Sequence, residues 1–383
     1  MNIIFLDSID KDTYGGMEEW IRLVGAGLHQ KGHNVYISGR GDSKFLKRVS
    51  ADNPEIEQIP LNISGDFNPV TIAKIYSEIK LRQIDIILVN FNKDLRLGGL
   101  AAKLEKDCKV IWSLGLDITK DSLVHKVLTP KLVDGVIVPS KALRDQITRF
   151  DYITSEQVEV IPIGIPAANL QIEKKAAREK VLEKFGLNEN AFICVTSGRL
   201  ADEKGHRYLI EAAPMIIEKC PQIVFLFLGD GQLKSELQAM ISEQSLEKYF
   251  VLAGMLDMDN VAEILPGCDL MIHPSIEETF GIAILEGMRA ELAVVASRVG
   301  GIPEVVMENE TALLVESRNA AEIAAAVLSL QSSQDKLKQM EQAGKTRWQN
   351  VFGYSKMIDK IESYLEGFIN SEKTYGTSET ART

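Results

Sequence analysis

The sequence predicts an α/β fold built from two doubly wound parallel-sheet domains in series. Short runs rich in β-branched residues alternate with longer segments of helical period, which is the pattern of βαβ units. The pattern is interrupted near Pro162 and then begins again with the same order of elements. A chain of 383 residues also suits two domains, since domains commonly hold roughly 100–200 residues.

The first domain begins with a β-branched run at Asn2–Leu6, which we predict to be a strand. Met17–Gln30 is expected to be a helix, because apolar side chains such as Trp20 and Leu28 repeat on one helical face. Later apolar runs predict further strands at Val35–Ser38, Ile84–Asn90, Lys109–Ser113, Gly135–Val138 and Val158–Ile161. Helical stretches between these runs favour a parallel sheet.

The second series starts with a predicted helix at Glu173–Phe185, which Gly186 ends. Another helix is expected at Lys204–Lys219, before Pro221. Apolar runs predict strands at Phe192–Ser197, Ile223–Leu228, Phe250–Ala253, Leu270–His273, Val294–Ala296 and Ala312–Val315.

Proline and glycine interrupt the periodicity between Pro162 and Asn169, and we place the domain boundary there. We therefore expect a first domain at residues 1–165 and a second at 166–350. A helix at 351–370 carries aromatic side chains that need a surface, so it is expected to return to the first domain. The polar residues 371–383 are expected to be disordered.

Composition excludes several classes of protein. Hydrophobic residues make up 45% of the chain and charged residues 25%, as in soluble globular proteins. No apolar run approaches the roughly 20 residues of a membrane span, and the N-terminus lacks a signal peptide, so a cytosolic location is expected. The cysteines are far apart in apolar surroundings and are expected to be buried free thiols: Cys108, Cys194, Cys220 and Cys268.

The charge is unevenly distributed. The net charge of −11 divides into −1 up to Ile165 and −10 after it. Because a nucleic-acid binder needs a basic face, nucleic acid is not an expected partner. The segment Lys44–Val49 is both basic and apolar, and contact with the cytosolic face of a membrane is an expectation there; the alternative is a solvated helix face.

The first chemical motif is Gly198–Gly205, between a predicted strand and a predicted helix. Arg199 and Lys204 place two cations beside a helix N-terminus, where backbone N–H groups also favour an anion. A diphosphate suits this arrangement. The alternative is that both cations pair with the neighbouring Asp202 and Glu203 on the surface.

The second motif, Ser275–Glu286, also follows a predicted strand and leads into a helix. Glu278 is expected in the loop and Glu286 inside the helix. The backbone amides of Phe280, Gly281 and Ile282 are expected to face phosphate oxygens. A carboxylate accepts two hydroxyl donors, so Glu286 suits a ribose and Glu278 a hexose. The alternative for each carboxylate is a solvated residue at a helix start.

Two glycine pairs complete the set. Gly300-Gly301 follows a predicted strand and suits a tight turn near a ligand or another backbone. Gly15-Gly16 joins the first strand to the first helix, opposite the second domain.

Taken in order, these motifs resemble the group 1 (family 4) retaining glycosyltransferases. The marks are Gly15-Gly16, Lys31-Gly32-His33, Gly198-Arg199 with Lys204-Gly205, Leu228-Gly229-Asp230-Gly231, the pair Glu278 and Glu286, and Gly300-Gly301-Ile302-Pro303-Glu304. The resemblance covers about residues 1–330. It implies a GT-B fold, in which two Rossmann-like domains face each other across a cleft and a C-terminal helix returns to the first.

The resemblance also implies roles for single residues. Arg199 and Lys204 would neutralise the diphosphate of a nucleotide-sugar donor, most often a UDP-sugar; Glu286 would bind its ribose, and Glu278 would lie near the transferred sugar. Gly16 would contact the donor or the acceptor from the first domain. Such enzymes use no metal, and their acceptors are saccharides or glycolipids, commonly of the cell envelope, in polysaccharide or lipopolysaccharide synthesis.

One departure affects the acceptor side. Many relatives have a histidine after the strand that corresponds to Lys109–Ser113, whereas this chain has Asp117 in that loop. We expect Asp117 to bind a hydroxyl group or act as a base. Asp257-Met258-Asp259 has the form of a metal-binding Asp-x-Asp motif, but it precedes a predicted helix and is better explained as a cap.

Two other functions share parts of this pattern. A sugar-nucleotide epimerase of similar fold would have the same diphosphate site but no acceptor. A non-catalytic sugar-nucleotide-binding partner would be consistent with the altered acceptor loop, although it would not need all of Arg199, Lys204, Glu278 and Glu286.

Overall fold

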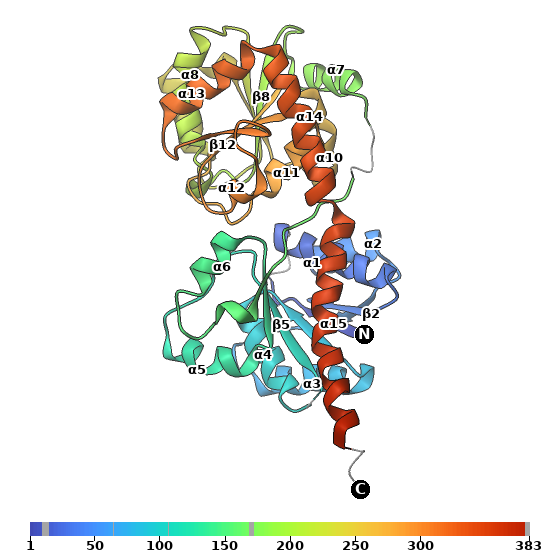
Figure 1. The fold of residues 1–383 in the computed structure, drawn as a ribbon. Coiled ribbons are helices and arrows are strands. Elements are labelled where there is room, and N and C mark those ends of the chain that lie inside the picture. Colours follow the sequence, from blue (N-terminus) through green and yellow to red (C-terminus); the bar gives the residue numbers. More distant parts are fainter. Residues whose placement is uncertain (10–14, 64, 106, 168–171, 380–383) are drawn as a thin grey trace. The chain divides into compact units, whose positions relative to one another are not determined.

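The computed structural model describes residues 1–9, 15–63, 65–105, 107–167 and 172–379, with the backbone alone for 371–379. The chain divides into two compact units, each with its own parallel sheet (Figure 1). Unit 1 contains residues up to Pro162 together with the C-terminal segment from Ser355. Unit 2 is Ile163–Tyr354.

In the described part of unit 1, seven parallel strands form one sheet in the order β3-β2-β1-β4-β5-β6-β7. The strands are β1 (Asn2–Leu6), β2 (Asn34–Gly39), β3 (Glu57–Pro60), β4 (Ile86–Val89), β5 (Lys109–Ser113), β6 (Gly135–Val138) and β7 (Val158–Val160). The helices are α1 (Gly16–Gln30), α2 (Lys44–Asp52), α3 (Pro69–Arg82), α4 (Asn92–Ala102), α5 (Leu123–Leu132), α6 (Lys141–Ile147) and α15 (Tyr354–Glu379). The order of strands reverses between β1 and β4.

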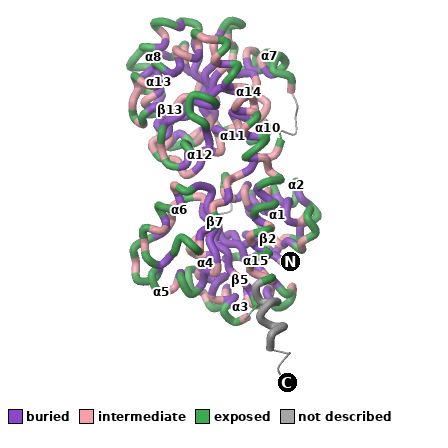
Figure 2. Tube along the Cα trace, in the orientation of Figure 1, coloured by how far each residue is buried: buried purple, intermediate pink, exposed green. Residues whose placement is uncertain are grey.

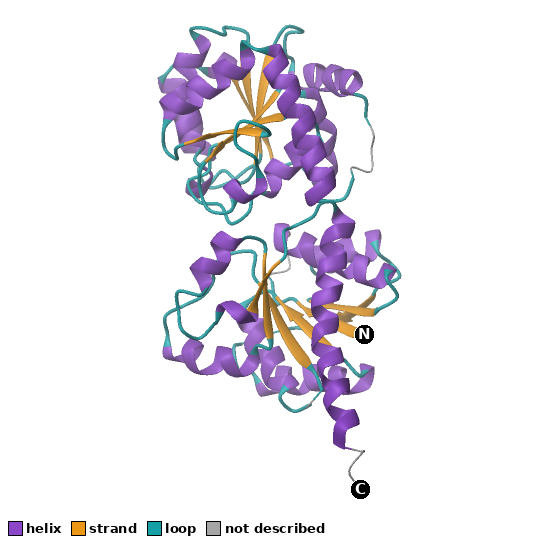
Figure 3. Ribbon diagram, viewed as in Figure 1, coloured by secondary structure: helices purple, strands orange, loops and turns teal. Residues whose placement is uncertain are grey.

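Successive side chains of a strand point to opposite faces of the sheet, and their contacts show which helices of unit 1 cover each face. Phe5 meets Trp20 of α1, and Gly135, which lies in the same row of the sheet, meets Tyr364 of α15. α1 and α15 therefore cover one face. The next row, which includes Leu6, packs with α3, α4 and α5 on the other face (Figure 3).

Unit 2 repeats this architecture with six described parallel strands in the order β10-β9-β8-β11-β12-β13. The strands are β8 (Phe192–Ser197), β9 (Ile223–Leu228), β10 (Phe250–Gly254), β11 (Leu270–His273), β12 (Ala293–Ser297) and β13 (Ala312–Val315). The helices are α7 (Lys174–Phe185), α8 (His206–Ile217), α9 (Lys234–Glu243), α10 (Met258–Ile264), α11 (Ile282–Arg289), α12 (Ile302–Val305), α13 (Ala320–Gln331) and α14 (Gln334–Val351).

The core of unit 2 lies on both faces of its sheet. One layer packs with α8, α9 and α13, and the other with α7, α11 and α14. Figure 2 shows the strands as the most buried parts of the unit. Because β9 is buried at all six positions, its sequence Ile223–Leu228 is continuously apolar, as expected for a strand covered on both sides.

The structure adds to three sequence expectations. In α2, Phe45, Leu46 and Val49 are buried, so the apolar side chains of this segment pack inside the unit, and contact of its basic residues with a membrane stays a prediction. Edge strand β3 was not predicted, because Glu57–Pro60 contains a single buried position. α15 is assigned as far as Glu379, and residues 380–383 lie outside the described part; the expectation of disorder for residues 371–383 stays a prediction.

Other expectations are confirmed. The four cysteines are buried and free. Asp257 caps α10, since its side chain accepts a hydrogen bond from the backbone N–H of Asn260 at 2.8 Å. Within the described residues, no helix combines the length and the apolar character that crossing a bilayer requires.

Candidate functional site

The site in unit 2 lies where the strand order reverses, between β8 and β11. In open parallel sheets, ligands bind beyond the carboxyl ends of the strands at this position. The loop after β8 carries Gly198 to Gly205, and the loop after β11 carries Pro274 to Gly281. These loops contain both motifs that the sequence singled out.

Backbone hydrogen bonds join these loops to each other. Ile276 N–H donates to the carbonyl oxygen of Glu203 at 2.8 Å, and Gly301 N–H donates to that of Glu278 at 3.0 Å. The loops that contain Glu203, Glu278 and Gly301 are therefore held together as one structure.

Glycines make these close approaches sterically feasible. A Cβ on Gly205, whose φ is +64°, would lie 2.1 Å from the carbonyl oxygen of Pro274. A Cβ on Gly300, whose φ is +49°, would lie 1.8 Å from the carbonyl oxygen of Glu278. Close contact with a neighbouring backbone is therefore enough to explain why glycine occupies both positions.

Glu278 is the centre of the side-chain arrangement. Its Oε2 accepts hydrogen bonds from Lys204 Nζ at 2.7 Å and from His273 Nε2 at 2.9 Å. Ser275 Oγ lies 3.0 Å from the same nitrogen of His273. The side chain of Glu278 is 11% exposed, so this carboxylate is held on the protein side and reaches solvent at one edge.

This environment fixes the charge of Glu278. Burial raises the pKa of the carboxyl group, but the hydrogen bond from His273 and the charges of His273 and Lys204 lower it more, to about 2. Glu278 is therefore a carboxylate at neutral pH. Burial and the nearby His273 and Lys204 lower the pKa of His206 to about 3, so this histidine is neutral.

The aliphatic stem of Lys204 folds back over the first residue of its own loop. A Cβ on Gly198 would lie 3.9 Å from Cδ and Cε of Lys204. Arg199 differs: its side chain is 71% exposed and pairs with Glu203 at 2.8 Å. The structure therefore brings Lys204 and Glu278 together, while Arg199 forms the surface ion pair that the sequence left open as an alternative.

The start of α11 supplies backbone donors beside Glu278. Gly281 precedes the helix with φ +100°, and the first N–H groups of a helix have no acceptor within it. Phe280 is 3% exposed and packs edge-on against Phe352 at 5.9 Å, so its ring belongs to the core. Ile282 is the first residue of α11, and the half-buried Glu286 lies one turn further along.

Two of the predicted residues belong to unit 1. Gly16 is the exposed first residue of α1. Asp117 lies between β5 and α5, where Oδ1 accepts from the backbone N–H and hydroxyl of Thr119 and Oδ2 accepts from Arg149 Nη1 at 2.5 Å. Both oxygens of Asp117 are thus engaged, and its role at the acceptor stays a prediction.

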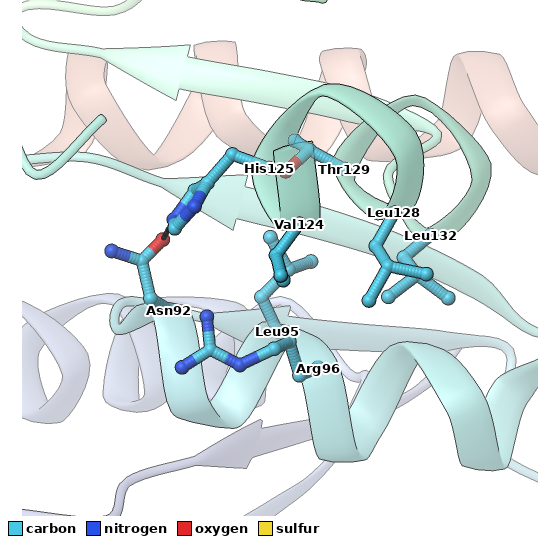
Figure 4. A pocket seen from close by; sticks show the side chains of 8 residues that line it. All are labelled: Asn92, Leu95, Arg96, Val124, His125, Leu128, Thr129 and Leu132. Atoms are coloured by element: carbon cyan, nitrogen blue, oxygen red, sulfur yellow. Dashed lines mark hydrogen bonds between the residues drawn. The ribbon is translucent and has the colours of Figure 1, made fainter. Parts of the chain in front are cut away.

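A small pocket between α4 and α5 lies near this loop (Figure 4). His125 Nε2 is 3.3 Å from Asn92 Oδ1, and Asn92 Nδ2 donates to the carbonyl oxygen of Ile118 at 2.8 Å. The pocket is also lined by Leu95, Arg96, Val124, Leu128, Thr129 and Leu132. Sequence reasoning did not select His125, although this histidine is linked to the loop where the usual histidine is missing.

Sequence reasoning also missed His273, and it gave no role to Ser275, the first residue of the second motif. A signal was available for His273, because a polar residue ends an otherwise apolar strand directly before the motif. Its contact with Glu278 depends on the turn between them, which residue spacing does not specify.

Two parallel-sheet units, the second with a cation–carboxylate pair and a helix N-terminus at its switch point, are the architecture of the GT-B fold. Comparison with solved structures agrees: the Anabaena protein Alr3699/HepE in complex with UDP matches 96% of this chain and 100% of that chain, with a TM-score of 0.82 and 21% identity. The models for "Glycosyl transferases group 1" and "Glycosyltransferase Family 4" match residues 177–347 and 14–169. The chain belongs to this family of group 1, family 4 glycosyltransferases.

Curated relatives are similar over different lengths. An alpha-maltose-1-phosphate synthase from Mycolicibacterium smegmatis is 30% identical over 60% of this chain and 62% of its own length. The match thus spans less than two thirds of that relative. The Escherichia coli UDP-Gal:alpha-D-GlcNAc-diphosphoundecaprenol alpha-1,3-galactosyltransferase is 27% identical over 81% of this chain and 82% of its own length.

Proposed function

We propose that the chain is a retaining glycosyltransferase that moves a hexose-type sugar from a nucleotide-diphospho-sugar, a UDP-sugar first of all, to a hydroxyl group of a saccharide or glycolipid. The observation that carries the proposal is the Lys204–Glu278 pair, 2.7 Å long, beside the N-terminus of α11. The UDP bound in the Anabaena structure and the UDP-galactose named for the Escherichia coli relative favour uracil as the base. The lipid-linked acceptor of that relative favours a role in cell-envelope polysaccharide synthesis at the cytosolic face of a membrane.

In the proposed reaction, the bond between the anomeric carbon and the diphosphate oxygen breaks, and its electron pair stays on the diphosphate. The acceptor oxygen bonds to the anomeric carbon from the same face, and its proton passes to the departing diphosphate. Negative charge therefore grows on the leaving group. Lys204 and the N–H groups of Ile282 and its neighbours stabilise this charge more in the transition state than in the ground state.

Glu278 has a positioning and electrostatic role in this scheme. Its low pKa keeps it ionised, so it is suited to accept hydrogen bonds from sugar hydroxyls and to stabilise positive charge at the anomeric carbon. Glu286 would accept the two ribose hydroxyls, and Arg199 would leave Glu203 to meet the diphosphate. We further propose that no metal ion is required, because Lys204 and the α11 N-terminus supply positive charge where the diphosphate leaves.

The test is a binding and transfer experiment. Calorimetry with UDP, GDP and ADP and their common sugars, with magnesium or with EDTA, is expected to select one nucleotide and to be insensitive to EDTA. Lys204→Ala is expected to weaken UDP binding and to slow transfer, and NMR of the product is expected to show the anomeric configuration of the donor. Release of UDP without an acceptor would contradict transfer, and the absence of nucleotide binding would contradict the donor site.

A further inference from the structure

His273 is the buried last residue of strand β11, and the proposed function gives it no role. Its side chain is 3% exposed, and its Nε2 lies 2.9 Å from Glu278 Oε2. Because a carboxylate oxygen can only accept a hydrogen bond, Nε2 is the ring nitrogen that carries a proton and donates. Ser275 Oγ, which is also buried, lies 3.0 Å from the same nitrogen. The imidazole ring is therefore held by contacts on the atom that faces Glu278.

The two carboxylate oxygens of Glu278 have different surroundings. Oε2 accepts hydrogen bonds from both His273 and Lys204. Among the described residues, Oε1 has no hydrogen-bond partner, and it is not one of the buried oxygens without a partner, so it borders solvent. A sugar hydroxyl group can therefore reach Oε1 while Oε2 stays bound to the protein.

The two donors to Oε2 differ in their freedom to move. The side chain of Lys204 is 20% exposed and carries its three N–H donors on a flexible four-carbon stem. The ring of His273 is nearly inaccessible and belongs to a strand that is paired on both sides, with β8 and with β12. Lys204 can therefore turn to another anion, whereas His273 stays where it is.

Binding of the donor makes use of this difference. In the proposed reaction, Lys204 stabilises the charge of the departing diphosphate, so its ammonium group has to turn towards phosphate oxygens. Glu278, whose side chain is only 11% exposed, then shares or loses this cation. A nearly buried carboxylate without a partner is costly, and the hydrogen bond from His273 is the contact that remains on Oε2.

We propose that His273 is a positioning residue for sugar transfer. It holds Glu278 by Oε2 while Lys204 turns to the diphosphate, so that Oε1 stays available to the transferred sugar. This inference rests on the proposed function, because it assigns the sugar to Glu278 and the diphosphate to Lys204.

A purely structural role for His273 makes a different prediction. Loss of an ordinary buried side chain would disturb the whole site, and UDP and a UDP-sugar would lose affinity together. Loss of a positioning residue for Glu278 affects the sugar and leaves UDP binding intact.

The matched variants are His273→Gln and His273→Met, because glutamine and methionine have similar length and only glutamine retains an N–H donor. His33→Met is the control, since His33 Nε2 lies at the same distance, 2.9 Å, from the carboxylate of Glu362, a residue of α15. Calorimetry on the full-length proteins measures UDP, and then UDP-glucose, UDP-galactose and UDP-N-acetylglucosamine to find the UDP-sugar that the wild type binds most tightly.

UDP is expected to bind all four proteins alike. The selected UDP-sugar is expected to bind His273→Gln and His33→Met like the wild type, and His273→Met about tenfold more weakly, the effect of one hydrogen bond to a charged group. If His273→Met lowers the thermal midpoint, His273→Phe provides the same comparison.

A second measurement needs no donor. NMR of protein with ¹³C-labelled glutamate follows the carboxyl group of Glu278, on which His273 and Lys204 are the charged neighbours. As the pH is lowered from neutrality, this carboxyl group is expected to titrate earlier in His273→Met than in the wild type or His273→Gln. The reason is that the hydrogen bond stabilises the charged form and so lowers the pKa of Glu278.

The proposal is overturned if folded His273→Met binds the UDP-sugar like the wild type, or if it loses affinity for UDP and the UDP-sugar equally. Identical titration of Glu278 in His273→Met and the wild type would also overturn it. Failure of UDP to bind any of the proteins would instead reject the proposed donor function, and the titration would still decide whether His273 holds Glu278.

Discussion

Gly205→Ala is expected to disrupt the connection between the two loops of the unit 2 site. The new Cβ would lie 2.1 Å from the carbonyl oxygen of Pro274, so the loops must separate by about 1 Å, and such overpacking costs about 1–3 kcal/mol. The separation also weakens the hydrogen bond from Ile276 N–H to Glu203, which contributes about 0.5–1.5 kcal/mol. A β-carbon at φ +64° adds a further strain of roughly 1–2 kcal/mol.

Gly186→Ala is the control that separates backbone strain from steric crowding. Gly186 has φ +63°, nearly the value at Gly205, but a Cβ there would meet no atom within 4 Å. Urea unfolding is expected to show Gly205→Ala less stable than Gly186→Ala by about 2–4 kcal/mol. Calorimetry is expected to show a loss of UDP affinity for Gly205→Ala alone, since Lys204 directly precedes Gly205 and moves with the displaced loop. Equal unfolding free energies for the two variants would refute the steric argument.

Three further predictions concern single side chains. Because the pKa of Glu278 in the folded protein, about 2, is below the ordinary value of 4.5 for a glutamate, its carboxylate stabilises the fold above pH 4.5, and this contribution disappears as the pH falls towards 2. Glu278→Gln is expected to lose roughly 3 kcal/mol at pH 7 and little at pH 2 in urea titrations; parallel pH profiles for mutant and wild type would contradict this. Glu286→Ala is expected to weaken binding of bare UDP by about tenfold or more in calorimetry, whereas the exposed control Glu277→Ala is not; equal affinities would exclude the ribose contact. Leu365→Ala removes a fully buried side chain from the face of α15 that packs on unit 1 and is expected to cost about 2–5 kcal/mol in urea unfolding, while Glu366→Ala changes stability little; similar effects of the two would place Leu365 outside the core.

The strands that carry the sites were predictable because they are buried on both sides. Apolar runs such as Leu270–His273 have no polar alternation, and the turns after them contain glycine. β3 gave no such signal, since Ile59 is its only buried residue and Pro60 ends it. An edge strand of this kind is determined by pairing with β2, which is a tertiary contact.

Site residues were predictable where a local pattern carried them. Glu278 and Glu286 share one strand–turn–helix segment, and Lys204 lies in another. The contact between Lys204 and Glu278 joins residues 74 positions apart, and only the strand order places them together.

The return of α15 to unit 1 has a consequence for the order in which the chain folds on the ribosome. The strands of unit 1 are synthesised first, yet the buried residues Ile358, Ile361 and Leu365 of its last helix emerge only after the whole of unit 2. Unit 2 is continuous in sequence and has all its strands available before then. The second unit synthesised is therefore the first able to complete its core, while the first retains an uncovered apolar surface that a chaperone could bind until α15 arrives.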